Sequence, residues 1–376
     1  MQRTAGWIAV VMAVTVLYLC ATGRAQAKKP KLVWQNSGGN VLSQKADFYG
    51  SAEAQRIAET VMLHQRNTGG WPKNRDMIRT LTDADRARLL RDKRRTDSIL
   101  DNGATHTQVR FLARVYRATN DGRLRDACLR GVDFILAAQY PNGGWPQVYP
   151  NPRGYHAHIT FNDGAMTGAI AVTRDIAERK ADFAFIDATR RAKAADATKR
   201  GIECILKCQI VVRGRLTAWC AQHDERTLAP RPARVYEKVS ISGGESVGVV
   251  RFLMSLDKPP PRVVAAVQGA VAWFDRAKIT GIRQVTRKAS SLPRGIDKII
   301  VKDPSAPPIW ARFYQIGTNK PIFCGRDGKI KATLAEIEPE RRTGYSWYGY
   351  YPAGLLRRDY PAWQKKWAPK HNVLAR

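Results

Sequence analysis

Acidic residues are scarce in this sequence, which has 32 Asp and Glu against 63 Lys and Arg and a formal net charge of +31. A surface so basic concentrates polyanions and speeds their capture at low salt. The chain also lacks a helix-turn-helix, zinc-finger or RNA-binding signature to accompany that charge, and the cations are scattered along its whole length. The charge therefore supports a polyanionic partner without identifying it, since nucleic acid, an anionic membrane surface and an acidic polysaccharide all fit.

A long apolar run is also missing, because spanning a bilayer takes about 20 such residues. The stretch from Ile8 to Leu19 is mostly apolar but has only about a dozen residues. It follows the basic Arg3 and precedes Ala25-Gln26-Ala27, which has the small-x-small form of a cleavage site. We predict a signal peptide at residues 1–27, a secreted or periplasmic protein, and no stable membrane association after cleavage; an uncleaved anchor is the alternative.

An even set of cysteines is lacking as well. Five cysteines remain after residues 1–27 are removed, and an odd number argues against a fully paired disulfide framework. Cys204 and Cys208 lie one helical turn apart, which permits a metal pair, but their apolar neighbours favour buried thiols. The histidines give no cluster with the spacing of a zinc site. We therefore expect His106 and His223 to orient neighbouring groups instead of binding zinc.

What the sequence does contain is a spaced repeat of amphipathic helices. Three helices each end on a glutamine that is followed by a glycine-containing turn and a tryptophan. These pairs are Gln65 and Trp71, Gln139 and Trp145, and Gln209 and Trp219. The glutamines are 74 and then 70 residues apart, and a further helix, led by 104–119 and 165–177, lies between consecutive repeats. This pattern predicts three helical hairpins.

Hairpins that place a turn with an aromatic residue at the same end suit an all-α fold, an α/α toroid with the partner crossing that end. An ordinary helical bundle with capping glycines is the alternative. Further helices are expected near Glu245 and after Pro261. From about 280 to 360 the chain is rich in Pro, Gly, cations and aromatics, with short β-type runs such as 298–302, which predicts irregular coil with short strands.

One segment, 219–246, has cations, carboxylates, an imidazole and prolines but no helical apolar period. Loops of this kind often carry function. Within it, Arg231 and Arg234 lie on either side of Pro232, which favours an extended path. A solvated basic turn is the simpler interpretation of this string taken alone.

Long motifs elsewhere give this loop a context. They are Asp101 to Gln108 (DNGATHTQ), Gly-Gly-Trp-Pro at 69–72 and 143–146, Phe161-Asn162-Asp163, IWARFY at 309–314 and PIFCGRDG at 321–328. Together they resemble the pectate lyases of polysaccharide lyase family 10, from about Tyr49 to Tyr350. The resemblance implies an (α/α)3 toroid and a polygalacturonate substrate.

Composition and the span of the resemblance together indicate how the chain is divided. We expect an N-terminal extension at 28–48 and a catalytic domain at 49–360, followed by a C-terminal tail at 361–376. Within the domain, the toroid should span about 49–279 and an irregular wall about 280–360.

A uronate polymer poses a definite chemical problem. β-Elimination removes the C5 proton beside an ionised carboxylate while the C4 oxygen leaves, so the site must stabilise charge that develops on that carboxylate. A divalent cation does so, and Ca²⁺ prefers oxygen ligands. The resemblance implies that Asp101 and Asp163 bind Ca²⁺ and bridge it to the substrate. By position alone, N-capping of a helix explains both aspartates more simply.

The resemblance assigns the remaining roles to arginines. Arg234 matches the family's Brønsted base, and Arg312 and Arg326 match its substrate-carboxylate arginines, whose planar forks suit a carboxylate. A guanidinium normally stays protonated, so we expect Arg231, Lys238, Ca²⁺ and burial by substrate to disfavour the charge of Arg234. Activity should then rise into alkaline pH. A cation stacked between aromatics and a turn arginine are the structural alternatives for Arg312 and Arg326.

Arg231 is expected to help bind substrate, because the sequence departs from the family's pattern at Ala229, where a basic residue is expected. Trp71 and Trp145 are expected to pin their turns, with stacking on sugar faces as the alternative. The sequence thus predicts an exported, monomeric, endo-acting, Ca²⁺-dependent pectate lyase without a nucleic-acid partner. A catalytically silent polyanion-binding protein on the same fold and a non-specific nucleic-acid binder are the alternatives.

Overall fold

The computed structural model describes residues 32–34 and 39–375. The predicted signal peptide at 1–27 and the start of the predicted extension lie outside the described residues. Within the described ranges, no helix is long and apolar enough to cross a membrane.

Seven helices form the repeated part of the fold. They are α1 (Ala52–His64), α3 (His106–Thr119), α4 (Gly122–Ala137), α5 (Ala165–Ala177), α6 (Ala188–Cys208), α7 (Glu245–Met254) and α8 (Pro261–Arg276). Helix α3 contacts α4, α5 contacts α6, and α7 contacts α8. Along the stack, α3, α5 and α7 contact one another in turn, as do α1, α4, α6 and α8. The predicted helical hairpins are therefore confirmed, and they form two adjoining rows.

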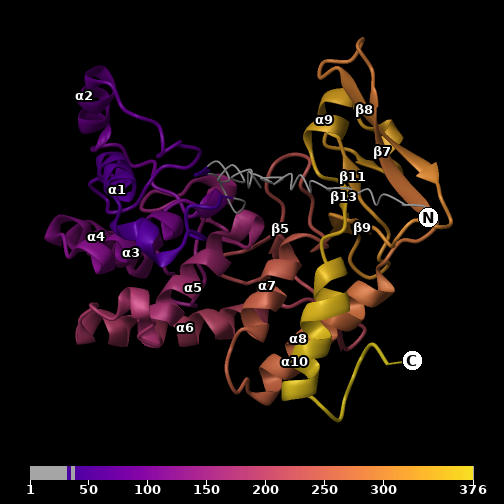
Figure 1. Ribbon diagram of the computed structural model, residues 1–376. Coiled ribbons are helices and arrows are strands. Elements are labelled where there is room, and N and C mark those ends of the chain that lie inside the picture. The colour runs from indigo at the N-terminus through magenta and orange to yellow at the C-terminus, as the bar shows by residue number, and fades with distance from the viewer. Residues whose placement is uncertain (1–31, 35–38, 376) are drawn as a thin grey trace, which may run out of the picture. The chain divides into compact units, whose positions relative to one another are not determined.

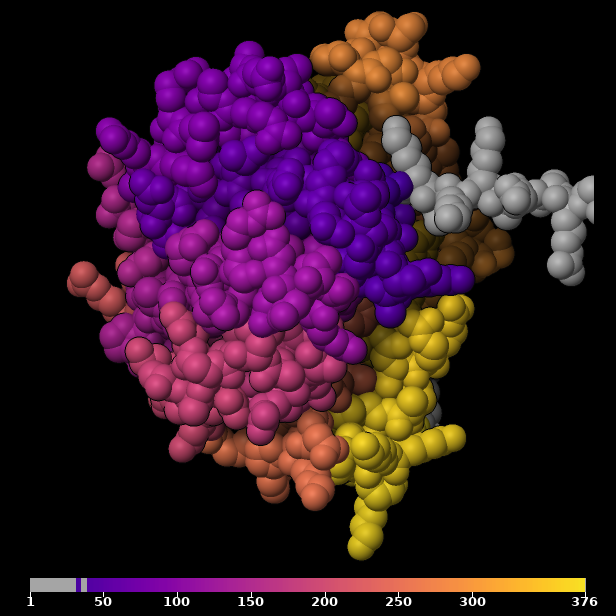
Figure 2. Space-filling model, turned by 60° about the vertical axis from the view of Figure 1, so that its left-hand side comes forward, coloured from indigo at the N-terminus to yellow at the C-terminus, as the bar shows by residue number. Residues whose placement is uncertain are grey.

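Figure 1 shows these hairpins following one another through the helical part of the chain. In the space-filling view the later hairpins appear as successive colour bands, with magenta followed by pink and then by orange (Figure 2). The contacts describe a stack of consecutive neighbours, and closure into the (α/α)3 toroid stays a prediction.

The glutamine of each repeat joins its own turn to the next hairpin. Gln65 Nε2 donates to Gly69 O at 2.8 Å and to Ala127 O in α4 at 2.9 Å. The other two glutamines repeat this pattern, Gln139 with Gly143 and Ala197 of α6, and Gln209 with Thr217 and Ala266 of α8. Each of these bonds occupies a donor that would otherwise lie unpaired inside the protein. The repeated glutamine thus fixes the position of each hairpin relative to the next.

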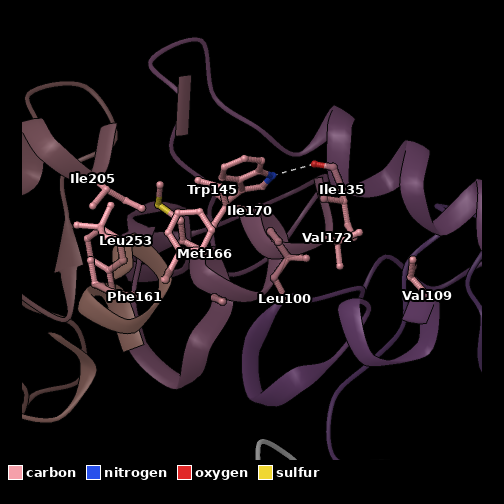
Figure 3. Close-up of a cluster of buried hydrophobic side chains, with 14 of the residues drawn as sticks. Leu100, Val109, Ile135, Trp145, Phe161, Met166, Ile170, Val172, Ile205 and Leu253 are labelled. Atoms are coloured by element: carbon pink, nitrogen blue, oxygen red, sulfur yellow. Dashed lines mark hydrogen bonds between the residues drawn. The ribbon is translucent and has the colours of Figure 1, made fainter. Parts of the chain in front are cut away.

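The tryptophan of each repeat pins its turn to the preceding helix. Trp145 Nε1 donates to Ile135 O at 2.8 Å (Figure 3), and Trp71 and Trp219 make the same bond to Val61 and Ile205. All three indoles are fully buried, so the pinning role predicted for Trp71 and Trp145 is confirmed and stacking on sugars is excluded. Trp310 makes an equivalent bond to Phe274 O at 2.8 Å, a fourth copy that the sequence analysis missed.

Helix boundaries follow the sequence closely where apolar residues reach the first turn, as in α5. Helix α6 begins at Ala188, well before its first buried residue, Ala194, because Asp187 caps it by accepting from Arg190 N at 2.8 Å. Helix α2 (Asp83–Asp92) was missed for the same reason, since its sequence is mostly charged and a capping box of Thr82 and Asp85 starts it.

Strands are short except in one hairpin. A three-stranded antiparallel sheet has the order β1 (Ile159–Thr160), β4 (Gln222–His223), β5 (Pro230–Arg231), and β7 (Ile282–Lys288) pairs with β8 (Ile296–Lys302). The remaining pairs are β2 (Val211–Val212) with β3 (Arg215–Leu216), β6 (Ile241–Ser242) with β10 (Phe313–Tyr314), β9 (Trp310–Ala311) with β13 (Tyr348–Gly349), and β11 (Phe323–Cys324) with β12 (Ile330–Lys331). The predicted all-α class therefore fits the repeated part. The predicted irregular wall contains a regular β-hairpin, with two strands of seven residues each, as well as α9 (Pro339–Gly344).

Two hydrophobic cores hold the chain together. The larger one runs through the hairpins and includes Trp34 from the predicted extension and Trp363 of α10 (Tyr360–Trp367) from the predicted tail. The smaller one lies in the C-terminal part and includes Tyr236, which comes from the 219–246 loop. That loop is therefore anchored in the C-terminal part.

The five described cysteines are free and buried, which confirms the buried-thiol interpretation of Cys204 and Cys208.

Candidate active site

The turns that precede α3 and α5 carry the two predicted metal ligands. Asp101 begins the short helix η2 (Asp101–Gly103), and Asp163 lies in η4 (Asn162–Gly164). Both turns use left-handed backbone, with φ of 53° at Asn102 and 48° at Asp163, a conformation that Asn and Asp tolerate better than other side chains. Because η2 contacts η4, the structure brings both aspartates into one region, here called the acidic turns.

The two carboxylate oxygens of Asp101 have different surroundings. Oδ2 accepts hydrogen bonds from Lys73 Nζ and from Asn102 Nδ2. Oδ1 is buried and, among the described residues, has no hydrogen-bond partner, an arrangement that costs free energy unless a ligand supplies one. Sequence reasoning missed Lys73, although its position directly after the first Gly-Gly-Trp-Pro marks it.

Asp163 is exposed to solvent. Its Oδ2 accepts from Asn162 Nδ2 at 2.8 Å. The pKa of Asp163 is raised above its ordinary value. The larger cause is loss of hydration of the carboxylate among protein atoms, and the smaller is repulsion by the negative charge of Asp101. Two carboxylates that repel each other in this way are stabilised by a cation placed between them.

The helix-capping explanation of these aspartates is wrong. The residues that cap α3 and α5 are Thr105 and Gly164, and neither helix start receives a side-chain capping bond. Asp101 and Asp163 are therefore available for another role.

The acidic turns make an incomplete cation site. Within the part of the chain that the structure describes, no group of three or more His, Cys, Asp or Glu could hold a metal ion, whereas Ca²⁺ takes about six to eight oxygen ligands. The unpaired Asp101 Oδ1 and the accessible Asp163 carboxylate nevertheless fit such an ion. Its remaining ligands would have to come from water and from a bound anion.

Arg312 reaches the acidic turns from the C-terminal part. Pairing of Phe313 with Ser242 places it at the start of α7. Its Nη2 donates to Glu245 Oε1 and to Asn162 Oδ1, the latter at 3.2 Å, while its Nε is buried without a partner among the described residues. Burial acts to lower the pKa of Arg312, but Glu245 together with Tyr345, Tyr351 and Asp163 raises it above the ordinary value, so the guanidinium stays protonated.

Arg234 forms a fork-to-fork ion pair with a buried carboxylate. Its Nε and Nη2 donate to Glu237 Oε2, at 2.8 Å, and to Oε1. These bonds raise the pKa of Arg234 above its ordinary value, against the opposing effect of burial. The expectation that neighbouring cations would disfavour its charge is wrong for the chain alone, because Glu237, which the sequence analysis missed, lies closest.

Two tyrosines gather the arginines into what is here called the arginine–tyrosine cluster. The guanidinium of Arg234 lies 5.0 Å from the ring centre of Tyr236 and 5.6 Å from that of Tyr345. Arg312 lies 4.6 Å from Tyr345, and Arg326 lies 5.6 Å from Tyr236. Buried Arg341 packs against both rings, at 4.7 and 5.4 Å. The predicted base and both predicted carboxylate-binding arginines therefore meet.

Arg326 and Arg231 are held more loosely than the other two arginines. Arg326 is 57% exposed and donates to Glu340 at 3.3 Å through two nitrogens. Arg231, on β5, is 50% exposed and pairs with Asp224 at 3.5 Å. The stacked-cation alternative thus describes a real contact of Arg312, while Arg326 and Arg231 have freedom to follow a ligand.

The buried histidines fix the backbone. His223 Nε2 accepts from Cys220 N at 3.2 Å, and its Nδ1 lies 2.8 Å from Leu228 O. These contacts hold the backbone of the 219–246 loop in place. His106 packs so closely on α5 that a Cβ at Gly168 would lie 2.3 Å from its Nε2. Burial lowers the pKa of each to about 4, so both are neutral.

The whole site combines one buried and one exposed carboxylate with a set of protonated guanidinium groups and aromatic faces. Such an arrangement can bind a polyanion and a cation together. Besides Lys73 and Glu237, the sequence analysis missed Glu245, Tyr236 and Tyr345, none of which lies in a motif that marks its partner.

The chain was compared with known proteins. A family model described as pectic acid lyase matches residues 65–356. A family 10 polysaccharide lyase from Cellvibrio cellulosa is 33% identical, with a TM-score of 0.72, over 87% of this chain and 94% of that one. A mutant of a family 10 polysaccharide lyase from the same organism, in complex with trigalacturonic acid, is 32% identical, with a TM-score of 0.72, over 90% of this chain and 100% of that one. The comparison with curated proteins gave no match.

Proposed function

This chain belongs to the pectic acid lyase family, and from that premise we propose that it is an exported, Ca²⁺-dependent, endo-acting pectate lyase. Its substrate is polygalacturonate, which it cleaves by anti β-elimination to 4,5-unsaturated oligogalacturonides. The bound trigalacturonic acid of the similar Cellvibrio structure supports this substrate.

The observation that carries the proposal is the link through Asn162. Its amide nitrogen donates to Asp163 at 2.8 Å, and its amide oxygen accepts from Arg312 at 3.2 Å. The side chain of Asn162 thus holds Asp163, the proposed metal ligand, close to Arg312, the proposed carboxylate-binding residue. A uronate whose carboxylate touches both a cation and Arg312 would satisfy the two halves of the site together.

The arginines bind and orient the chain of uronates. Arg312 has a buried Nε with no partner among the residues that the structure describes, and Arg326 has an exposed guanidinium on the ring of Tyr236. Planar forks of this kind align carboxylates in a fixed plane. Arg231 adds a further exposed cation on β5.

Asp101 and Asp163 would hold Ca²⁺, whose chemistry is to neutralise the substrate carboxylate and so acidify the C5 proton. The buried Oδ1 of Asp101 supports this assignment. Lys73 holds the other oxygen of Asp101 and so orients the carboxylate.

Arg234 takes the C5 proton on a guanidine nitrogen while the C4 oxygen leaves. The neutral form needed for this is rare, because Glu237 stabilises the charged form. The same bonds stabilise the product, protonated Arg234, as it forms, which favours proton transfer from a weak acid. Burial by a bound chain removes water from the pair and reduces the stability of the charged state.

The hairpin stack supports the family's (α/α)3 toroid, with the substrate crossing the end where η2, η4 and the start of α7 gather. Export through a signal peptide at 1–27 and action as a monomer complete the proposal.

One observation favours the second candidate function, a catalytically silent polyanion-binding protein. In the chain by itself the bonds to Glu237 raise the pKa of Arg234, as expected for a cation that only binds.

A single assay separates the two functions. The protein is incubated with polygalacturonate and Ca²⁺ from neutral to alkaline pH, and ultraviolet absorbance of unsaturated uronides is followed. A lyase gives rising absorbance; binding without any rise supports the silent alternative.

A further inference from the structure

We infer that Glu237 is a positioning residue, which fixes the guanidinium of Arg234 so that Nη1 alone is left to meet the substrate. The inference rests on the proposed function, since it concerns how the proposed base is aimed. Nε and Nη2, which form one edge of the guanidinium, both donate to Glu237. Among the described residues, no hydrogen bond to Nη1 is found.

The carboxylate that holds this edge is itself immobilised. The side chain of Glu237 is only 4% exposed, against 39% for that of Arg234. Tyr345 Oη donates to Glu237 Oε1 at 2.6 Å, and Arg234 N donates to Oε2 at 3.2 Å. Burial raises the pKa of Tyr345, so its hydroxyl keeps the proton that it donates. Glu237 is therefore held by Tyr345 and by the backbone of Arg234 as well as by the guanidinium.

The backbone and the aromatic rings complete this fixed geometry. Glu237 N donates to Arg234 O at 2.7 Å, and Ala233 N donates to Glu237 O at 3.0 Å, which closes a tight turn around the pair. The rings of Tyr236 and Tyr345 pack against the guanidinium. Its plane and its edge are both determined before substrate arrives.

The chain offers a contrast in Arg326 and Glu340, the same two residue types without this support. Both side chains are exposed, by 57% and 41%, and both bonds are 3.3 Å long. A binding arginine tolerates such freedom, whereas a base must present one nitrogen to one proton. The difference in support matches the difference in proposed role.

The sign of the mutational effect distinguishes positioning from simple charge. Glu237→Gln keeps the side-chain shape but loses the negative charge that favours protonated Arg234. If charge were the only effect, more of the neutral base would form and kcat would rise. If Glu237 positions Arg234, kcat falls by about 10- to 100-fold, because small misplacements of reacting groups cost that much, while KM changes less than about threefold.

The test measures kcat and KM on polygalacturonate with Ca²⁺ for wild type, Glu237→Gln, Tyr345→Phe, Arg234→Ala and the double variant Arg234→Ala/Glu237→Gln. The matched control is Glu203→Gln, which breaks an exposed pair with Arg262, at 3.0 Å, between α6 and α8. We expect wild-type kinetics in the control and a smaller loss of kcat in Tyr345→Phe than in Glu237→Gln. In the double variant, Glu237→Gln should add less than about twofold, because it acts through Arg234.

Unfolding midpoints separate this role from a general loss of structure. We expect Glu237→Gln and Tyr345→Phe to have similar unfolding midpoints. If Glu237→Gln is folded and its kcat equals or exceeds that of the wild type, the inference is overturned. Further loss of at least tenfold in the double variant also overturns it, since Glu237 would then act without Arg234. An inactive wild type, in contrast, overturns the proposed function and this inference with it.

Discussion

The acidic turns and the arginine–tyrosine cluster contribute opposite charges to one site, and they are built in different ways. Asp101 and Asp163 each lie in a short turn before a helix of the repeated part, α3 or α5, so the hairpin repeat places them. The cluster draws Arg234 and Tyr236 from one loop, and its other members from segments about 80 to 110 residues further along the chain. One half is made by local repetition and the other by long-range assembly.

The two halves also differ in how completely their charges are satisfied. Asp101 has a buried oxygen with no hydrogen-bond partner in the described part of the chain, and Asp163 is open to solvent. Arg234 and Arg312 are already paired with the buried carboxylates of Glu237 and Glu245. The acidic turns therefore await a ligand, whereas the arginines must act from within existing ion pairs.

The largest effect is expected at Arg234. Arg234→Ala should lower kcat by about 10²–10⁴, the usual contribution of a general base, with little change in KM. Steady-state kinetics on polygalacturonate measure both. If Arg234→Lys keeps near-full kcat while Arg231→Ala abolishes turnover, the base is Arg231, on the other side of Pro232.

The acidic turns should fail through the metal. Asp101→Ala and Asp163→Ala should each lower activity by about 10²–10³, as expected when a charge-stabilising group is lost. Neither aspartate caps a helix, so circular dichroism should stay at wild type. Full activity of the wild type in excess chelator would show that the acidic turns do not hold a required ion.

The ion pair of Arg234 predicts an unusual pH dependence. The base acts when neutral, and Glu237 raises the pKa of Arg234 above its ordinary value. At all accessible pH values below that pKa, the neutral fraction should rise about tenfold per pH unit. A plot of log kcat against pH should thus climb through the alkaline range until another step limits. A plateau beginning near neutral pH would point to a different base.

How much of this site follows from the sequence depends on which half is considered. Helical periodicity predicted the helices at 104–119 and 165–177, and the family resemblance singled out Asp101 and Asp163 just before them. Lys73, Glu237 and Glu245 could not be recognised, because single charged residues in so basic a chain do not reveal their partners. Helix α2 was missed because capping and not an apolar period defines it. The pairing of β6 with β10, which delivers Arg312, depends on packing across the fold.

The smallest effects should separate the two carboxylate-binding arginines. Arg312 is buried and bonded to two side chains, so Arg312→Lys should raise KM and lower kcat together, by about 10-fold each. Exposed Arg326 can be replaced more easily, and Arg326→Lys should raise KM by only about two- to fivefold. Equal changes in KM and kcat at both positions would contradict the claim that burial sets the size of the effect.

The central claim, that the two halves together perform elimination, is tested most directly by the masses of the products. Wild-type protein is incubated with polygalacturonate and Ca²⁺, and the fragments are analysed by mass spectrometry. Elimination predicts, for each cut, one fragment that is lighter by one water than the product of hydrolysis and carries a double bond at its new non-reducing end. Fragments with the masses of hydrolysis products, or an uncut polymer, would contradict the account.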